Sequence, residues 1–148
     1  MLNQSEVRPV HFKWIILKNK VYDKLREAPG CAGFADLPAV DNDAVNVKKG
    51  VIGLGAKAMD IYIIEDTNFQ SLKELFDDLT ERVANGWSRG QETTFVFVYY
   101  TGHGVQANYT YAVLNNPDPR RWRFPLEMYL RTLGTNPGAW VVGIFDCC

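Results

Sequence analysis

The chain has 148 residues, a length typical of one domain that can bury a sizeable core. Hydrophobic residues make up 47% of it and charged residues 22%, which is ordinary globular composition and excludes disordered and fibrous classes. The formal net charge is −1, so no global positive field exists to hold a phosphate backbone, and nucleic-acid binding is disfavoured.

The sequence shows no targeting signal and no membrane span. Its N-terminus breaks a short apolar run with lysines and lacks a signal-peptide cleavage site, and no stretch reaches the ~18 apolar residues that span a bilayer. The three cysteines, two of them adjacent, do not make a disulfide framework and suit a reducing compartment. We therefore expect a cytoplasmic protein with no membrane partner.

The first predicted strand is the apolar run FKWIIL at 12–17, and His11 before it is expected at the surface. A helix is expected within 41–55, with an Asp or Asn as its N-cap. Three apolar residues in this segment recur at helical spacing: Ala44, Val47 and Val51.

The second predicted strand is DIYIIE at 60–65, and a helix is expected within 67–86. Thr67 and Gln70 have the spacing of a capping box, and Gly86 suits the end of the helix. One apolar stripe runs along this segment and is assigned to the core: Leu72, Leu75, Phe76, Leu79 and Val83.

The third predicted strand is TFVFVYY at 94–100. The chain after it is expected to be irregular as far as Trp122. A shorter helix is expected within 124–134, with Pro125 near its first turn and Gly134 past its end.

The fourth predicted strand, at 139–145, completes an order of strands and helices that predicts an α/β domain. Because the strands show little polar alternation, we expect a mainly parallel sheet covered by helices. Sites in such sheets collect at the carboxyl ends of strands. His103 follows the third strand, and Cys147 and Cys148 follow the fourth. If these strands are neighbours, ~4.8 Å apart, imidazole and thiol lie within reach of each other.

A histidine beside a cysteine can act in acyl transfer. The imidazole takes the thiol proton and so produces the nucleophilic thiolate. The reaction also needs donors to the oxyanion of the tetrahedral intermediate. Gly104, which has no side chain to block its N–H, and the N–H of the nucleophile could supply them. These residues outline a cysteine hydrolase site.

Four segments, spanning 12–148, resemble the caspase-like cysteine peptidases, most closely the metacaspases. WIILKNKVYDKL resembles the family's first strand and following loop, and LPAVDNDA resembles the pattern Leu-x-Gly-Cys-x-Asn-Asp-Ala, with Ala39 and Val40 in place of Gly and Cys. VYYTGHGVQ resembles the motif Tyr-Ser-Gly-His-Gly, and GIFDCC resembles Asp-x-Cys. The resemblance implies a three-layer caspase-like fold.

The resemblance also implies roles for individual residues. Cys148 would be the nucleophile and His103 the general base, with Gly104 in the oxyanion hole. The substrate-binding residues would be Asp43, Asp146 and Thr101, the last in the motif's Ser position. A carboxylate pair favours a substrate Arg or Lys through charge-assisted hydrogen bonds, so we expect cleavage of peptides after Arg or Lys.

The family motif continues in His-Ser-Gly, whereas this chain stops at Cys148. We therefore expect a truncated chain or the large-subunit half of a longer protein. Its missing partner would be the C-terminal small-subunit segment, without which the chain would be inactive or nearly so.

Other interpretations remain open at this point. Cys147 and Cys148 could form a vicinal disulfide, and Asp43 could cap a helix. A phosphate loop at TGHG, a zinc site and a nucleic-acid patch at 120–123 are each disfavoured. Family resemblance makes calcium the one cofactor to consider, although no calcium-loop spacing assigns ligands. The rival functions are a catalytically silent interaction module and an unrelated nucleotide-binding domain.

Overall fold

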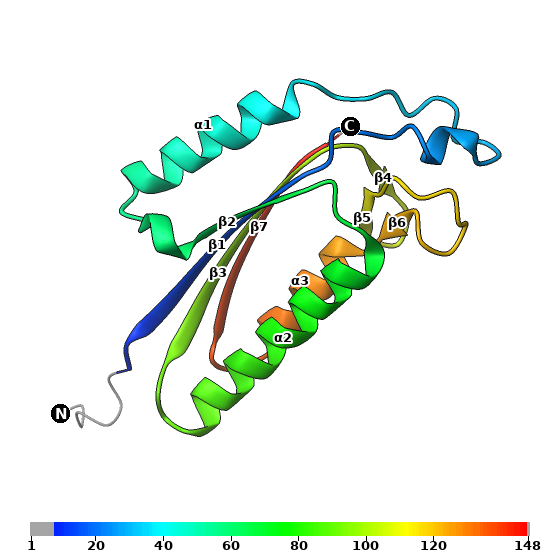
Figure 1. The fold of residues 1–148 in the computed structure, drawn as a ribbon. Helices are drawn as coiled ribbons and strands as arrows, with labels where there is room; N and C mark the ends of the chain where they lie inside the picture. The colour runs from blue at the N-terminus through cyan, green and yellow to red at the C-terminus, as the bar shows by residue number, and fades with distance from the viewer. Residues whose placement is uncertain (1–7, 148) are drawn as a thin grey trace.

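A parallel four-stranded sheet forms the centre of the protein (Figure 1). The structure, a computed structural model, describes residues 8–147. In space the strands lie in the order β2-β1-β3-β7. Their bounds are β1 Val10–Lys18, β2 Ile61–Glu65, β3 Thr93–Thr101 and β7 Ala139–Asp146. All three neighbouring pairs are parallel, so every strand points its carboxyl end toward the same edge.

Helices cover both faces of this sheet, which makes the three-layer α/β fold expected from the sequence (Figure 1). α1 (Val40–Gly53) lies on one face, and α2 (Phe69–Ser88) and α3 (Leu126–Gly134) lie on the other. Two single-turn 3₁₀ helices, η2 (Leu25–Glu27) and η3 (Ala58–Asp60), sit in the connections. The α/β prediction is therefore confirmed.

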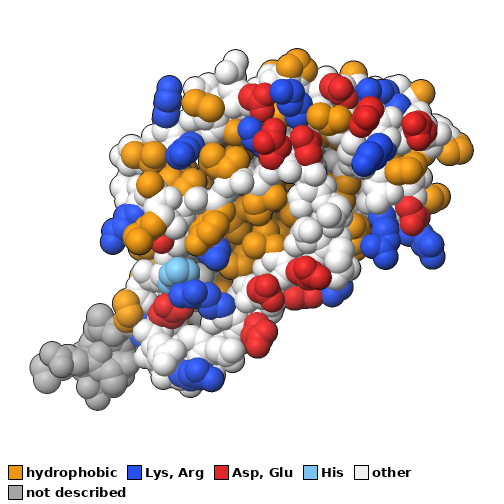
Figure 2. Space-filling view, viewed as in Figure 1, with side chains coloured by type: hydrophobic (Ala, Val, Ile, Leu, Met, Phe, Trp, Pro, Cys, Tyr) orange, Lys and Arg blue, Asp and Glu red, His pale blue; other side chains and the backbone are white. Residues whose placement is uncertain are grey.

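The main core lies between the sheet and the α2–α3 layer. The predicted stripe of α2 is buried there apart from Leu75, which is half-buried. Opposite it stand alternate residues of β1 and β3: Ile15, Leu17, Val96, Val98 and Tyr100. On the other face α1 contributes Ala44 to a smaller cluster with Ile16 and Tyr99. Apolar side chains also gather in the recess that separates the two helical layers (Figure 2).

The four strand predictions hold to within two residues at each end. β1 begins earlier than expected, at Val10, so His11 belongs to it and is half-buried rather than a surface residue before the strand. Its pairing with Thr94 of β3 explains the longer strand, because ladder hydrogen bonds extend beyond the apolar run.

The helix ends differ from the sequence prediction. Ala39 is the N-cap of α1 and makes no side-chain cap bond, so neither Asp nor Asn caps it. At α2 the Asn68 side chain accepts the N–H of Ser71, which displaces the expected capping box by one residue. Gly86 lies inside α2, and Gly134 is the last residue of α3 instead of the residue after it.

A second, small antiparallel sheet occupies the region expected to be irregular. It has the order β4-β5-β6, with bounds β4 Gly104–Gln106, β5 Thr110–Val113 and β6 Arg123–Phe124. Strands of two to four residues are too short to show a period in the sequence, which is why the prediction was wrong here. The small sheet directly follows β3 and stands at the carboxyl edge of the main sheet.

Within residues 8–147, no helix combines the length and the apolar character that crossing a membrane requires.

Candidate active site

The strand register brings the two predicted catalytic segments side by side. β3 and β7 are neighbours, as the sequence prediction required, and Thr101 stands opposite Asp146. His103 comes two residues after Thr101, and Cys148 comes two residues after Asp146. Cys148 itself lies outside the described residues. The register therefore supplies the alignment of the two segments, and the role of Cys148 stays a prediction.

Three hydrogen bonds fix the backbone of His103. Its N–H donates to the hydroxyl of Tyr22 at 2.9 Å. Its carbonyl accepts the Tyr100 hydroxyl at 2.6 Å and the Val113 N–H at 3.0 Å. These three partners come from the β1 loop, from β3 and from β5, so the histidine is held where three segments converge.

The imidazole ring is held as well. Its Nε2 lies 2.7 Å from the carbonyl oxygen of Ala35. The rings of Tyr22 and Phe34 pack edge-on against it, with centroids 4.7 and 5.3 Å away. Because a carbonyl oxygen only accepts, this contact places a proton on Nε2, so in the neutral ring it is Nδ1 that carries the lone pair. A neutral ring in this tautomer is ready to accept a proton at Nδ1.

The two tyrosines that hold His103 remain neutral phenols. Burial raises the pKa of Tyr22, and it raises the pKa of Tyr100 well above its ordinary value of 10.0. The protonated Tyr22 hydroxyl both accepts from His103 and donates to the carbonyl of Asn19 at 3.0 Å. The support of the histidine therefore does not change over the pH range in which an imidazole titrates.

The glycines on either side of His103 leave room that a side chain would fill. A Cβ on Gly102 would lie 2.5 Å from the Tyr100 hydroxyl and 2.9 Å from that of Tyr22. A Cβ on Gly104 would lie 2.5 Å from the sulfur of Cys147. Both contacts are closer than real Cβ atoms approach, so a side chain at either position would force a neighbouring side chain of the site to move.

Cys147 faces the Gly104 side of the sheet. It is half-buried and packs against the main core. It also lines a cavity of about 290 Å³ that lies beside the candidate site, together with Gly104, Val105, Gln106, Thr110 and Phe145. Its position between core and cavity makes Cys147 a packing residue next to the predicted nucleophile.

The two predicted acidic residues lie on the α1 side of the same edge. Asp43, in the first turn of α1, accepts the Thr101 hydroxyl at 3.1 Å. Asp146 accepts the Tyr99 hydroxyl at 2.6 Å. Burial, followed by the hydrogen bond to Asp146, raises the pKa of Tyr99, so this phenol remains a donor. Each bond engages one carboxylate oxygen and orients the other.

Thr101 is 2% exposed, and its hydroxyl is engaged by Asp43. Thr101 is therefore buried beneath the Asp43 carboxylate and is not exposed at the surface of the site. Its predicted contact with substrate stays a prediction, and its observed contact is one that positions Asp43.

Two acidic residues near the carboxyl ends of β1 and β2, Asp41 in the first turn of α1 and Asp66 after β2, are engaged by donors of the protein itself. Lys18 and Lys20 bind the two oxygens of Asp41 at 3.0 and 2.7 Å. An oxygen of Asp66 accepts the N–H groups of Lys20 and Val21. In the described part of the chain, no group of three or more His, Cys, Asp or Glu side chains is arranged to hold a metal ion.

Sequence reasoning missed four residues that build the site. Tyr22, Phe34 and Ala35 lie in the long connection after β1, 68 or more residues before His103 in the sequence. Tyr99 lies inside the predicted third strand, and the sequence prediction gave it no role in the site. No local pattern marks the first three, because their contacts with His103 arise from the tertiary fold.

Comparison with known protein families finds a match over most of the chain. The family model described as Caspase domain matches residues 14–148, which is most of the chain. No curated protein matches it.

Proposed function

The chain belongs to the caspase-domain family, and from that premise we propose that it carries the catalytic site of a cysteine endopeptidase of the metacaspase type. Family membership implies a hydrolase of the cysteine-peptidase kind in general. The observation that carries the proposal is the alignment of Thr101 with Asp146, because the same offset relates His103 to Cys148.

In the proposed reaction, Nδ1 of His103 takes the thiol proton of Cys148, and the thiolate attacks the scissile carbonyl carbon. The N–H groups of Gly104 and Cys148 stabilise the oxyanion. The C–N bond then breaks as the imidazolium gives its proton to the leaving amine, which leaves a thioester on Cys148. Water, deprotonated by His103, hydrolyses this thioester and restores the thiol.

The contact of Nε2 with the Ala35 carbonyl supports this assignment. When Nδ1 gains a proton the ring becomes cationic, and the carbonyl dipole at 2.7 Å stabilises that cation. The same contact fixes the ring plane, so Nδ1 keeps one direction during both proton transfers. Ala35 therefore acts through its backbone and places no requirement on its side chain.

The proposed substrates are peptides or proteins cut after Arg or Lys. Asp43 and Asp146 lie on the same side of β3 and β7, each oriented by a hydroxyl from β3. Two oriented carboxylates would bind a guanidinium or ammonium through charge-assisted hydrogen bonds. An acidic residue before the scissile bond would instead be repelled.

We also propose that this chain turns over substrate slowly by itself. β7 pairs only with β3 within the described residues, and it exposes large apolar side chains such as Trp140, which is 68% exposed. The strand that carries Asp146 is thus an uncovered edge, and a polypeptide covering it would stiffen the cleft. A peptidase-like turnover number for the 148-residue chain with an Arg peptide would contradict this point.

We place the protein in the cytoplasm, since a catalytic thiol and a buried Cys31 suit a reducing compartment. Fractionation of cells that express the tagged chain tests this assignment. Recovery in a secreted or oxidising fraction would contradict it.

The test of the proposed chemistry is active-site labelling, which needs only one turnover. A thiol-reactive peptide ending in Arg should label Cys148, located by peptide mapping, in this chain or in any longer protein that contains it. His103→Ala should slow labelling by about 10²–10⁴-fold. The control Glu81→Ala, on the exposed face of α2, should label at the wild-type rate. Equal labelling of the His103→Ala variant would favour a catalytically silent interaction module.

The specificity has its own test. Asp146→Asn should lower the preference for an Arg probe over a neutral one by about 10–100-fold, as expected when a hydrogen bond to a charged group is lost. The matched control is Asp77→Asn, which removes a carboxylate from an exposed ion pair with Lys73. An unchanged preference in the Asp146 variant would remove Asp146 from the substrate pocket and leave the peptidase assignment standing.

A further inference from the structure

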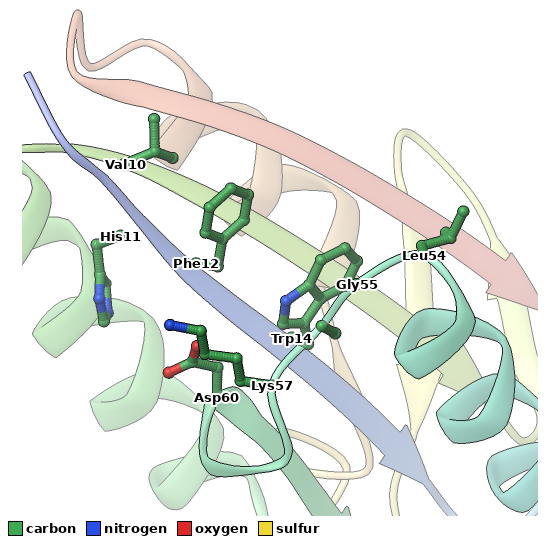
Figure 3. A pocket seen from close by; sticks show the side chains of 9 residues that line it. Val10, His11, Phe12, Trp14, Leu54, Gly55, Lys57 and Asp60 are labelled. Atoms are coloured by element: carbon green, nitrogen blue, oxygen red, sulfur yellow. The ribbon is translucent and has the colours of Figure 1, made fainter. Parts of the chain in front are cut away.

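A second cavity lies at the opposite end of the sheet, where the strands begin (Figure 3). Its volume is about 290 Å³. Along β1, four residue steps from Trp14 to Lys18 separate it from the carboxyl edge, which is about 13 Å at ~3.3 Å per residue. Its walls are Val10, His11, Phe12 and Trp14 of β1, the segment 54–57, and Asp60. It shares no residue with the candidate active site.

One edge of β1 is open beside this cavity. β1 pairs with β3 from Val10 to Lys18, whereas its pairing with β2 starts only at Trp14, opposite Ile61. Among the described residues, the first four positions of β1 therefore have a strand partner on one side only. An open strand edge presents N–H and C=O groups that another extended segment can pair with.

A buried donor in the cavity wall also lacks a partner. Trp14 is 8% exposed, and within the described residues its indole Nε1 makes no hydrogen bond. Figure 3 shows this nitrogen on the side of the ring that is nearer to Lys57 and Asp60. Because a buried unpaired N–H is costly, this donor indicates that an acceptor from outside the described chain belongs here.

The polar rim carries one positive and one negative charge. Lys57 is the N-cap of the single 3₁₀ turn η3 and Asp60 is its last residue, and neither takes part in an ion pair within residues 8–147. Opposite charges so close together oppose each other's field, so the rim does not select a strong anion or cation. A dipolar group with an acceptor and a donor, such as a peptide amide, suits both side chains.

We propose that this cavity binds an extended peptide segment of a partner protein, with one large apolar side chain packed against Phe12 and Trp14, whose rings stack on each other with centroids 6.3 Å apart. The segment lies along the open edge of β1, and one of its carbonyl groups accepts the Trp14 N–H. Ligand pockets for whole small molecules measure ~300–1,000 Å³, so a cavity at the lower limit suits a single side chain better than a nucleotide. Addition of a strand at a sheet edge, with a side-chain pocket beside it, is a recurring mode of peptide recognition.

Titration by nuclear magnetic resonance tests the proposal through the indole N–H signals of the ¹⁵N-labelled chain. Trp14→Phe identifies the Trp14 signal. The probe is acetyl-Thr-Phe-Thr-amide, and the matched control probe is acetyl-Thr-Gly-Thr-amide. The Phe probe should move the Trp14 signal saturably, with a roughly millimolar midpoint typical of such small ligands. The Gly probe should not move it.

Filling the cavity should abolish that shift. Ala56 lines the cavity, so Ala56→Phe should prevent binding. Met59→Phe, at a position 77% exposed and outside the cavity wall, should leave binding intact. The remaining indole signals report whether each variant is folded, and Ala56→Leu replaces Ala56→Phe if they are displaced.

Three results would overturn the proposal: no shift with the Phe probe, an equal shift with the Gly probe, or a shift that persists in the folded cavity-filled variant. A shift with free phenol but none with the Phe probe would also overturn it, because the cavity would then bind a small aromatic molecule instead of a peptide.

Discussion

The two ends of the central sheet treat their polar groups in opposite ways. At the carboxyl end, the backbone and ring of His103 are bonded to Tyr22, Tyr100 and Ala35. At the amino end, three side chains carry a buried polar atom without a partner in the described chain, namely His11, Trp14 and Thr94, whereas at the carboxyl end only Oδ1 of Asn19 does. The side chains at the carboxyl end are thus mostly hydrogen-bonded before substrate binds. At the amino end, several buried polar atoms have hydrogen-bonding capacity that the described chain does not use.

The two ends therefore contribute differently to the stability of the fold. Hydrogen bonds that hold a catalytic group reduce the reorganisation needed during the reaction. Unpaired buried groups do the reverse, because they cost stability unless a ligand or partner satisfies them. Substitutions of the same kind at the two ends should therefore have different signs.

The largest effect is expected for Gly104→Ala at the carboxyl end. The new Cβ would lie 2.5 Å from the Cys147 sulfur and 3.0 Å from its Cβ, so this side chain and the end of β7 are pushed away from β4, which carries the proposed oxyanion donor. Labelling of Cys148 by the Arg probe should slow about 10²-fold, as for loss of one oxyanion donor. Measured labelling rates check this.

The matched control is Gly50→Ala, inside α1, where a Cβ meets nothing within 4 Å. It should keep the labelling rate and raise the free energy of unfolding by about 1 kcal/mol, because Ala favours helix more than Gly does. Equal loss of labelling in both glycine variants would contradict the close-approach argument.

The next effect is expected for Tyr22→Phe. It removes a buried hydroxyl that accepts the His103 N–H and donates to Asn19, and it leaves both groups unsatisfied. The free energy of unfolding should fall by about 1–3 kcal/mol, measured by urea denaturation. A variant as stable as the wild type would show that this hydroxyl does not organise the site.

Thr94→Val removes a hydroxyl at the other end of β3. Thr94 is 1% exposed, and its Oγ1 has no hydrogen-bond partner within the described residues. Deleting an unsatisfied buried hydroxyl should raise the free energy of unfolding by about 1 kcal/mol, the opposite sign to Tyr22→Phe. A destabilised Thr94→Val variant would break the contrast between the two ends.

The smallest effect concerns acid. Hydrogen bonds from the Arg26 side chain and from the N–H of Tyr22 lower the pKa of Asp36 below its ordinary value of 3.8. A carboxyl group whose pKa is lower in the folded chain than in the unfolded chain stabilises the fold at pH values above the unfolded-state pKa. This contribution is lost as the pH falls through the folded-state pKa. Asp36→Asn should therefore lose less stability than wild type between about pH 4 and pH 2.

Urea denaturation at several pH values measures this difference. Asp78→Asn, on the exposed side of α2, serves as the control and should retain the wild-type acid dependence. An acid dependence of Asp36→Asn that matches the wild type would show that this carboxylate does not stabilise the β1 loop.

The sequence predicted the parts of the fold that follow local rules. Short apolar runs located all four strands of the main sheet, although only β1 and β3 contain buried residues and the edge strands β2 and β7 contain none. That β3 and β7 are neighbours was only a condition of the sequence argument, and the strand register meets it. Apolar spacing likewise located α2, whose stripe is buried.

What the sequence did not predict depends on contacts between distant segments. The small sheet β4-β5-β6 forms from strands too short to show a pattern. The Ala35 carbonyl acts through the backbone and has no sequence signature. His11 looked like a surface residue because nothing local shows that β1 extends to Val10 and encloses a cavity.

The most direct test of the central claim is the pH dependence of alkylation at Cys148. If His103 takes the proton of this thiol, Cys148 of the wild-type chain should be alkylated at pH 6–7 far faster than an ordinary thiol, whose pKa is about 8.5. In His103→Ala that excess should disappear and reactivity should follow an ordinary thiol titration. Identical profiles for the two proteins would contradict the account.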